Sequence, residues 1–449
     1  MNADSGFYLS VARDIYCYGE NYYLSANAYS PLGMYLLGIP FLFFNSINSP
    51  IIFLVIVFVF NLVNGFFFYQ ILRYLNIEKL NAGLHTSFFV LYIFLMEGSM
   101  IILEPFVLFF ILTGLLALLH RHFFMAGFLV FLSFYSKQYA LFVLPGFLLY
   151  PLMGNNFYHE KVKCALKVVL GFLIPFIILL ILIGFLYSYD FNKAFLKILG
   201  ITSVGSDATG HGYSYKLFIY RTIQLLIGYP LLFFWIYFTF QNPKNTIKIL
   251  LVINKSNMNI LLLFLLLLAG SLFQLYFAAN MHYFILIIPW ILLITALIQK
   301  EFELRHPKRE IVFTIVFFIS LLLAGVTTKN TIDRKLIAYK EQVLESQFIG
   351  SVIPKGSKVQ IQRLTVNPAQ FFLLGYHSSN SSKLGYGFDV LYDAETTLNR
   401  MDSGSFYICK KELQITNWDR IESMSNYVNP MNLSDSLIIY KIGIKSSYH

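Results

Sequence analysis

Runs of Leu, Ile, Phe and Val that approach or exceed the thickness of a bilayer constrain this chain more than any other feature. A transmembrane helix needs about 20 predominantly apolar residues, and the 449-residue chain contains run after run of this kind. Only 12% of its residues are charged, against about 25% in an ordinary soluble domain. The sequence therefore predicts an all-α polytopic membrane protein.

Ten apolar segments are predicted to cross the membrane. The short run 31–45 is below spanning length, so it is expected to form helices that lie in the interface. This divides the chain into a first extracytoplasmic loop (1–49), a transmembrane core (50–328) and an extracytoplasmic domain (329–449). The predicted spans lie near 50–72, 80–96, 105–119, 123–135, 139–151, 165–187, 217–240, 258–278, 283–298 and 311–328.

The distribution of Lys and Arg between alternate loops predicts the orientation. One set of loops contains twelve basic residues and the other contains four. Cytoplasmic loops carry an excess of Lys and Arg, so the richer set is predicted to be cytoplasmic and both 1–49 and 329–449 are predicted to lie outside. The richer set is 73–80, 118–124, 152–164, 241–257 and 299–310, and the poorer set is 97–104, 136–138, 188–216 and 279–282.

The segment 123–151 has a second interpretation that would invert every later loop. It could form one span with Lys137 near its middle instead of two short segments. A lysine at the bilayer centre costs about 2.5 kcal/mol or more. A short re-entrant pair with Ser136, Lys137 and Gln138 at the outer surface is therefore favoured.

The formal net charge of +10 does not indicate a nucleic-acid-binding protein, because the basic residues are scattered in short loops. Cys17, Cys164 and Cys409 are far apart and lack metal-ligand spacing, so neither a disulfide framework nor a zinc site is predicted.

The polar segment 329–449 is expected to form a small α/β domain. Strands are predicted within VIPKGSKVQIQRL, GSFYICKKEL and SLIIYKIGIK, whereas HSSNSSKLGYG is predicted to be a loop. Its role could be to recognise the acceptor or to form a lid that stabilises the outer face.

Polar residues at the outer ends of the predicted spans form a candidate active site. Carboxylates can accept a proton from an attacking hydroxyl group, and Lys or Arg can bind a phosphate. The candidate carboxylates are Asp4 and Glu104, the candidate cations are Lys137 and Arg221, and Tyr8, His282 and Tyr283 complete the set.

Each candidate also has a structural interpretation, which the sequence leaves open. The alternatives are helix N-capping for Asp4, a favourable position at the positive end of a helix for Glu104, extension to the headgroups for Lys137 and Arg221, and an aromatic belt for His282 and Tyr283.

The order of these motifs resembles that of the GT-C superfamily of membrane glycosyltransferases, which includes protein O-mannosyltransferases and aminoarabinose transferases. DSGFYLSVARDIYCYG followed by YSPLGMYLLGIPFLFF resembles the first outer loop of that superfamily. LEPFVLFF is similar to its second acidic site, YSKQYALFVLPGFLLYP to its lysine-bearing turn, and HYFILIIPWILL to a late helix. The resemblance covers the chain up to about residue 300.

The resemblance implies an enzyme that transfers a sugar from a polyprenyl-phosphate donor to a glycan, lipid or protein acceptor, on the outer face of the bacterial inner membrane. It implies that Asp4 is the general base, that Glu104 orients the acceptor or the base, and that Lys137 binds the carrier phosphate. Arg221 as a second phosphate ligand is inferred from its depth and side in the membrane, not from the resemblance.

Two departures from the superfamily pattern concern the N-terminus and metal use. Relatives have one helix before the acidic loop, so a further transmembrane helix before Met1 is expected, the alternative being that span 50–72 translocates its own tail. Many relatives carry a second acidic residue directly after the first, where this chain has Ser5. A mechanism without a metal or other cofactor is therefore favoured, with a divalent metal as the alternative.

Three other functions are compatible with a polytopic membrane protein. An O-antigen or capsule polymerase is expected to use arginines in paired outer loops, and 188–216 contains none. A lipid-saccharide flippase or transporter needs polar residues along a path through the bundle, for which the candidates are Lys167, Arg221 and Gln274. A structural scaffold would not need Asp4 and Glu104 on one face.

Overall fold

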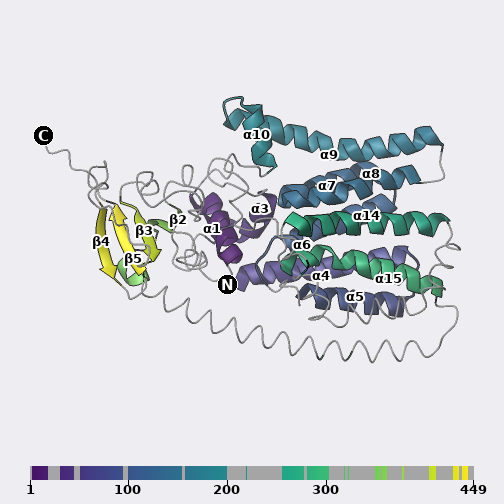
Figure 1. The fold of residues 1–449 in the computed structure, drawn as a ribbon, viewed down its shortest axis with the longest axis horizontal. Coiled ribbons are helices and arrows are strands. Elements are labelled where there is room, and N and C mark those ends of the chain that lie inside the picture. The colour runs from purple at the N-terminus through teal and green to yellow at the C-terminus, as the bar shows by residue number, and fades with distance from the viewer. Residues whose placement is uncertain are drawn as a thin grey trace.

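The structure is a computed structural model in which most of the described residues form a bundle of helices packed side by side. Two short N-terminal helices and a β-sheet lie next to one end of this bundle (Figure 1). The described residues are 3–18, 31–44, 51–94, 100–153, 157–199, 255–277, 281–302, 349–354, 356–361, 377–378, 404–410, 428–433 and 437–442, with the single residues 219, 318 and 322.

Eight of the ten predicted spans coincide with helices of the bundle. The predicted spans 217–240 and 311–328 lie outside the described residues, apart from residues 219, 318 and 322. The eight helices are α4 (Ile51–Tyr74), α5 (Lys79–Ile93), α6 (Glu104–Leu119), α7 (Phe123–Ser136), α8 (Leu144–Met153), α9 (Tyr158–Leu186), α14 (Lys255–Phe277) and α15 (Ile288–Phe302), and a short helix α10 (Phe191–Ile198) follows α9.

Two of the described helices, α4 and α9, are long and apolar enough to cross a membrane. Their 24 and 29 residues correspond to lengths of about 36 and 43 Å at 1.5 Å per residue. The apolar helix α6 has 16 residues and α7 has 14, which gives about 24 and 21 Å. The bundle therefore combines long helices, such as α4 and α9, with shorter ones, such as α6 and α7.

The chain reverses direction between α7 and α8. Helix α7 ends at Ser136, Lys137 is extended (φ −161°, ψ 130°), and a 3-10 helix, η3 (Gln138–Val143), leads into α8. The interpretation of 123–151 as one span is therefore wrong, and the predicted pair of short segments is confirmed.

Parts of the chain that were predicted to be cytoplasmic meet at the end of the bundle remote from the sheet (Figure 1). Hydrogen bonds between side chains and backbone carbonyls join them in pairs. The Tyr74 hydroxyl donates to Leu119 O (2.6 Å), the Asn259 amide to Met153 O (2.9 Å) and the Lys300 ammonium to Leu75 O (2.7 Å). These contacts agree with the predicted grouping of the loops.

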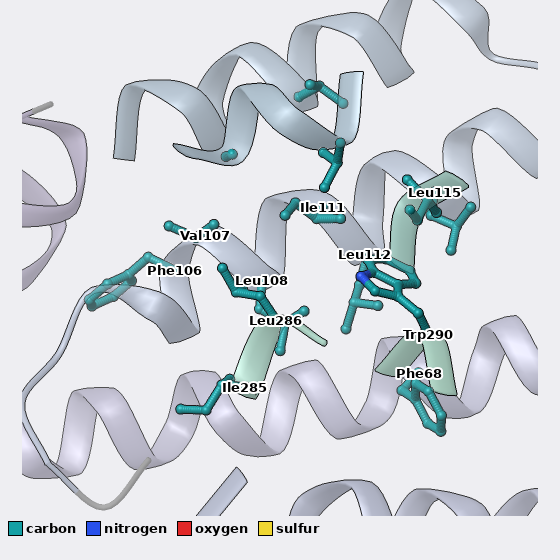
Figure 2. Packing of buried hydrophobic residues seen from close by; sticks show 14 of the residues in the cluster. Phe68, Phe106, Val107, Leu108, Ile111, Leu112, Leu115, Ile285, Leu286 and Trp290 are labelled. Carbon is teal, nitrogen blue, oxygen red and sulfur yellow. The ribbon is translucent and has the colours of Figure 1, made fainter. Parts of the chain in front are cut away.

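Helix α6 lies at the centre of the hydrophobic core. Twelve of its 16 residues are buried, as expected for a helix that is apolar on all sides. Figure 2 shows its side chains beside Phe68 of α4, Trp290 of α15, and Ile285 and Leu286 of the 3-10 helix η5 (Met281–Leu286). The Trp290 indole also donates a hydrogen bond to Ser271 Oγ (2.9 Å). Close packing on all sides fixes the position of α6 and of the residue that begins it.

The N-terminal helices α1 (Ala3–Tyr18) and α3 (Leu32–Gly38), with the 3-10 helix η1 (Ile39–Leu42), lie against the other end of the bundle (Figure 1). A Cβ atom on Gly38 would lie 2.4 Å from the Tyr16 ring, so glycine permits this contact between α3 and α1. Burial raises the pKa of the Tyr16 hydroxyl, which donates a hydrogen bond to Tyr35 O (2.9 Å). Tyr8 and Ala12 are buried, but so is every residue from 8 to 14, so this part of α1 is enclosed on all sides rather than buried along one face.

A five-stranded mixed sheet lies beyond α1, next to the same end of the bundle as α3 (Figure 1). Its strands have the order β2-β1-β3-β5-β4, with β1 parallel to β2 and β3, and β5 antiparallel to β3 and β4. The strands are β1 (Lys358–Ile361), β2 (His377–Ser378), β3 (Phe406–Lys410), β4 (Val428–Leu433) and β5 (Leu437–Ile442).

Strands β1, β3 and β5 fall within the three predicted segments, whereas β2 corrects the prediction that HSSNSSKLGYG is entirely a loop. Its two residues are held by pairing with β1, a long-range contact that no local pattern reveals. Strand β4 was not predicted; it contains Pro430 and lies at an edge of the sheet, where a residue without an N–H group is tolerated. An extracytoplasmic domain that begins at 329 stays a prediction.

Candidate active site

Glu104 is the first residue of α6, and the first turn of this helix is held by two neighbouring helices. Pro105 occupies that turn as predicted; its missing N–H group costs nothing at this position. Asn64 of α4 donates a hydrogen bond to Pro105 O (2.9 Å), and Ser133 of α7 donates one to Val107 O (3.0 Å). Both contacts are buried, so they fix the position of the Glu104 backbone.

The Glu104 carboxylate forms a buried ion pair with Lys137. The Lys137 Nζ atom lies 2.5 Å from Glu104 Oε1, and the two side chains are 2% and 1% exposed. Lys137 is therefore buried in the protein, which corrects the expectation that it is exposed at a surface or extends to the headgroups; that this turn lies on the outer side of the membrane stays a prediction. The reason is tertiary: α1 places Tyr8 beside the ammonium, and α3 contacts the end of α7, where a Cβ on Gly33 would lie 3.3 Å from Ser136 O.

Three tyrosine rings surround the Lys137 ammonium. Its Nζ atom lies 5.7 Å from the ring centroid of Tyr8 and 5.0 Å from those of Tyr139 and Tyr283, within the range in which an aromatic face attracts a cation. Tyr139 and Tyr283 also contact each other edge to face, with centroids 5.0 Å apart. The rings thus take the place of solvent around the charge.

The two oxygens of the Glu104 carboxylate have different environments. Oε1 accepts hydrogen bonds from the Lys137 ammonium and the Tyr139 hydroxyl, and His282 Nε2 lies 3.8 Å from it. Oε2 is buried and accepts no hydrogen bond from the residues that the structure describes. A buried carboxylate oxygen without a donor is costly, so Oε2 is suited to accept a hydrogen bond from a ligand.

The ion pair lies below the N-terminal end of α4. The hydrogen bond between Asn64 and Pro105 O places Asn64 of α4 at the height of the first turn of α6. From Asn64, α4 extends a further 13 residues toward its N-terminus at Ile51. At 1.5 Å per residue this is about 20 Å beyond the start of α6. The ion pair therefore lies deep at the end of the bundle against which α1 and α3 pack.

Five of the seven predicted site residues meet around this ion pair, and two cannot be placed there. Asp4 lies in the first turn of α1, but its side chain is outside the described residues, as is all of Arg221. The five that meet are Tyr8, Glu104, Lys137, His282 and Tyr283. Their catalytic and binding roles stay predictions.

Sequence reasoning missed Tyr139, although it follows Lys137 by only two residues. In a chain with 31 tyrosines, nothing in the local pattern distinguishes this one. The useful signal was the turn itself, because a chain that reverses at Lys137 brings the next residues of η3 to the same end of the bundle.

A second buried ion pair in α1 was also missed. Arg13 Nε lies 3.9 Å from Asp14 Oδ1, and the two side chains are 4% and 1% exposed. The sequence signal was an RD dipeptide inside the apolar stretch YLSVARDIY. Burying two charges carries a desolvation cost that their attraction offsets only when the geometry is good and further hydrogen bonds are made.

Among the described residues, no group of three His, Cys, Asp or Glu side chains is placed to hold a metal ion. Because the Asp4 side chain lies outside those residues, a mechanism without a metal stays a prediction.

Comparison with known proteins identifies the fold. The crystal structure of ArnT from Cupriavidus metallidurans in the apo state is similar, with a TM-score of 0.62 and 12% identity over 97% of this chain and 92% of that chain. This chain has the GT-C fold. The structure of the same ArnT bound to undecaprenyl phosphate matches this chain with a TM-score of 0.59 and 9% identity, over 99% of this chain and 94% of that one. No protein-family model and no curated protein sequence matches this chain.

Proposed function

We propose that this protein is an integral membrane glycosyltransferase that moves a sugar from a polyprenyl-phosphate donor to a glycan, lipid or protein acceptor outside the cytoplasm. The observation that carries the proposal is the buried pair of Glu104 and Lys137 at one end of an ArnT-like bundle. The ArnT of the comparison is bound to undecaprenyl phosphate. The phosphate of a polyprenyl carrier is the kind of group that the buried Lys137 ammonium can bind.

The proposed reaction begins when the acceptor hydroxyl attacks the anomeric carbon of the sugar. Asp4 takes the proton of that hydroxyl, and the bond between the anomeric carbon and the phosphate oxygen breaks. The transition state has oxocarbenium character, as in glycoside chemistry generally. A carboxylate with an ordinary pKa of about 4 is a weak base. It can still assist this attack, because the bond to the leaving phosphate is largely broken in the transition state and the anomeric carbon is then strongly electrophilic.

Lys137 is the proposed ligand of the departing phosphate, and Arg221 is proposed as a second. The negative charge that develops on the phosphate oxygen needs a nearby cation, and the Lys137 ammonium is proposed to supply it. Glu104 orients the acceptor or the base through Oε2, the oxygen that the described residues leave without a donor. Tyr8, His282 and Tyr283 line the same site and are proposed to contact the substrate.

The proposed location is the bacterial inner membrane, with the active site on its outer face. The excess of basic residues in the opposite set of loops supports this orientation. The C-terminal sheet lies next to the same end of the bundle as the site (Figure 1), so it is positioned either to recognise the acceptor or to cover the site.

The test is a transfer assay on the full-length protein with a panel of radiolabelled polyprenyl-phosphate sugars. Mass spectrometry of surface glycans and lipid carriers in a deletion strain selects the sugar, because the missing modification identifies it. Asp4→Asn is expected to abolish transfer at normal expression, and Lys137→Met is expected to abolish it in purified protein that thermal unfolding shows to be folded. Transfer retained within a few-fold in both variants would refute the proposed chemistry.

A lipid-saccharide transporter is the alternative, and the same deletion strain distinguishes it. Loss of a transporter leaves the complete lipid-linked saccharide to accumulate on the cytoplasmic side, whereas loss of the transferase leaves the loaded carrier outside and the acceptor unmodified.

A further inference from the structure

The ion pair that makes Lys137 a suitable phosphate ligand also neutralises it. Its ammonium lies 2.5 Å from Glu104 Oε1 and is buried. A phosphate that binds Lys137 has to compete with this carboxylate, and removing one partner from a buried charge leaves the other uncompensated. Something else in the site therefore has to stabilise Glu104 when the ammonium turns toward a ligand.

We propose that Tyr139 is a positioning residue that keeps Glu104 hydrogen-bonded while Lys137 is shared with the phosphate of a polyprenyl carrier. This inference rests on the proposed function and adds a residue to it. Tyr139 donates its hydroxyl hydrogen to Oε1, the same carboxylate oxygen that Lys137 contacts.

The position of the Tyr139 ring does not depend on its hydroxyl group. Residue 139 belongs to η3, which starts directly after Lys137. The ring packs edge to face on Tyr283 and lies 5.0 Å from the Lys137 ammonium. Phenylalanine can make both contacts, so Tyr139→Phe removes one hydrogen bond to the carboxylate and little else.

The ionisable groups around the Glu104–Lys137 pair come from three parts of the described structure. The junction of α7 and η3 contributes Lys137 and Tyr139, η5 contributes His282 and Tyr283, and α1 contributes Tyr8 through its contact with Lys137. Of these groups, Lys137, Tyr139 and His282 approach the carboxylate itself. Without the Tyr139 hydroxyl, the carboxylate depends more on Lys137 and holds its ammonium more tightly.

The experiment is a double-mutant cycle that measures the dissociation constant of undecaprenyl phosphate. The full-length protein in lipid nanodiscs is compared in four forms: native, Y139F, E104Q and the double variant. Y139F is expected to bind about tenfold more weakly, which corresponds to about 1.4 kcal/mol. E104Q is expected to bind more tightly than the native protein, because it removes the competing charge. In the E104Q background, Y139F is expected to change binding less than twofold.

Tyr74→Phe is the matched control, because it also removes a phenol that donates to one acceptor, Leu119 O, at the other end of the bundle. It is expected to leave binding unchanged, and thermal unfolding of each variant verifies that it is folded. If Y139F loses the same affinity in the native and E104Q backgrounds, the proposal is overturned, because Tyr139 would then contact the phosphate directly. Unchanged affinity of Y139F in the native background would also overturn it. If Lys137→Met binds undecaprenyl phosphate as tightly as the native protein does, Lys137 is not the phosphate ligand. That result would refute the proposed function, and with it the role of Tyr139 that depends on it.

Discussion

Glu104 and Lys137 are 33 positions apart in the chain, and their charged groups meet 2.5 Å apart in the interior. Glu104 begins α6 and Lys137 follows the end of α7, so two antiparallel helices bring the charges to the same end of the bundle. Neither side chain is more than 2% exposed. The energetics of the pair are therefore those of buried charges, which are costly to separate.

Removing Lys137 alone is expected to destabilise the protein. Lys137→Met leaves the Glu104 carboxylate buried without its cation, which costs about 3–5 kcal/mol. Combining Lys137→Met with Glu104→Gln is expected to restore most of that loss, because no uncompensated charge remains. Unfolding in mixed detergent micelles measures both. Equal stability of the single and double variants would show that the pair is not energetically coupled.

The contact between Asn64 and Pro105 O is expected to matter more for turnover than for stability. Asn64→Leu removes one buried hydrogen bond, worth about 1 kcal/mol, but it frees the turn that positions Glu104. A displacement of a catalytic group by about 1 Å can reduce the rate up to 100-fold, so transfer is expected to fall at least tenfold.

Thr86→Val is the control for that variant. It also removes a side-chain hydrogen bond to a backbone carbonyl, Ala82 O, but the contact lies within α5 and does not hold α6. Its transfer rate is expected to stay within twofold of the native rate. Similar losses in Asn64→Leu and Thr86→Val would contradict a positioning role for Asn64.

Helices α7 and α9 pack so closely at two glycines that larger side chains do not fit. A Cβ on Gly127 would lie 2.0 Å from Val168 O, and one on Gly171 would lie 2.1 Å from Phe124 O. Small residues allow such close backbone contact between membrane helices. Gly127→Leu is expected to cost about 3 kcal/mol or more through overpacking, as measured by the yield of folded protein and its thermal unfolding.

Gly83→Ala in α5 is the matched comparison, because a Cβ atom added at Gly83 would have no neighbour within 4 Å among the described residues. It is expected to be neutral or stabilising by up to about 1 kcal/mol, since alanine favours the helix. A Gly127→Leu variant as stable as Gly83→Ala would mean that α7 and α9 do not pack as the structure shows.

The orientation can be measured with single cysteines at the two ends of the bundle. In a background without native cysteines, Ser188→Cys is expected to react with a membrane-impermeant maleimide in intact cells, and Arg121→Cys only after permeabilisation. Both positions are exposed, Ser188 after α9 and Arg121 after α6. The opposite labelling pattern would invert the predicted topology.

The sequence predicted the helical bundle well because apolar periodicity and length are local properties. The reversal at Lys137 followed from the cost of a lysine at the centre of a span, and the structure confirms it. The burial of Lys137 could not be predicted, because it depends on α1 and α3 packing over the end of the bundle. Tyr139 and the two-residue strand β2 were missed for the same reason: long-range contacts define them.

The depth of Glu104 below the N-terminal end of α4 also bears on hydrolysis. A sugar activated on a phosphate can be lost to water, the most abundant nucleophile near any membrane. Expelling solvent from the reacting groups suppresses that side reaction. If the proposed function is right, about 20 Å of helix beyond the ion pair and the tyrosine rings packed around the ammonium protect the loaded carrier from hydrolysis until an acceptor arrives.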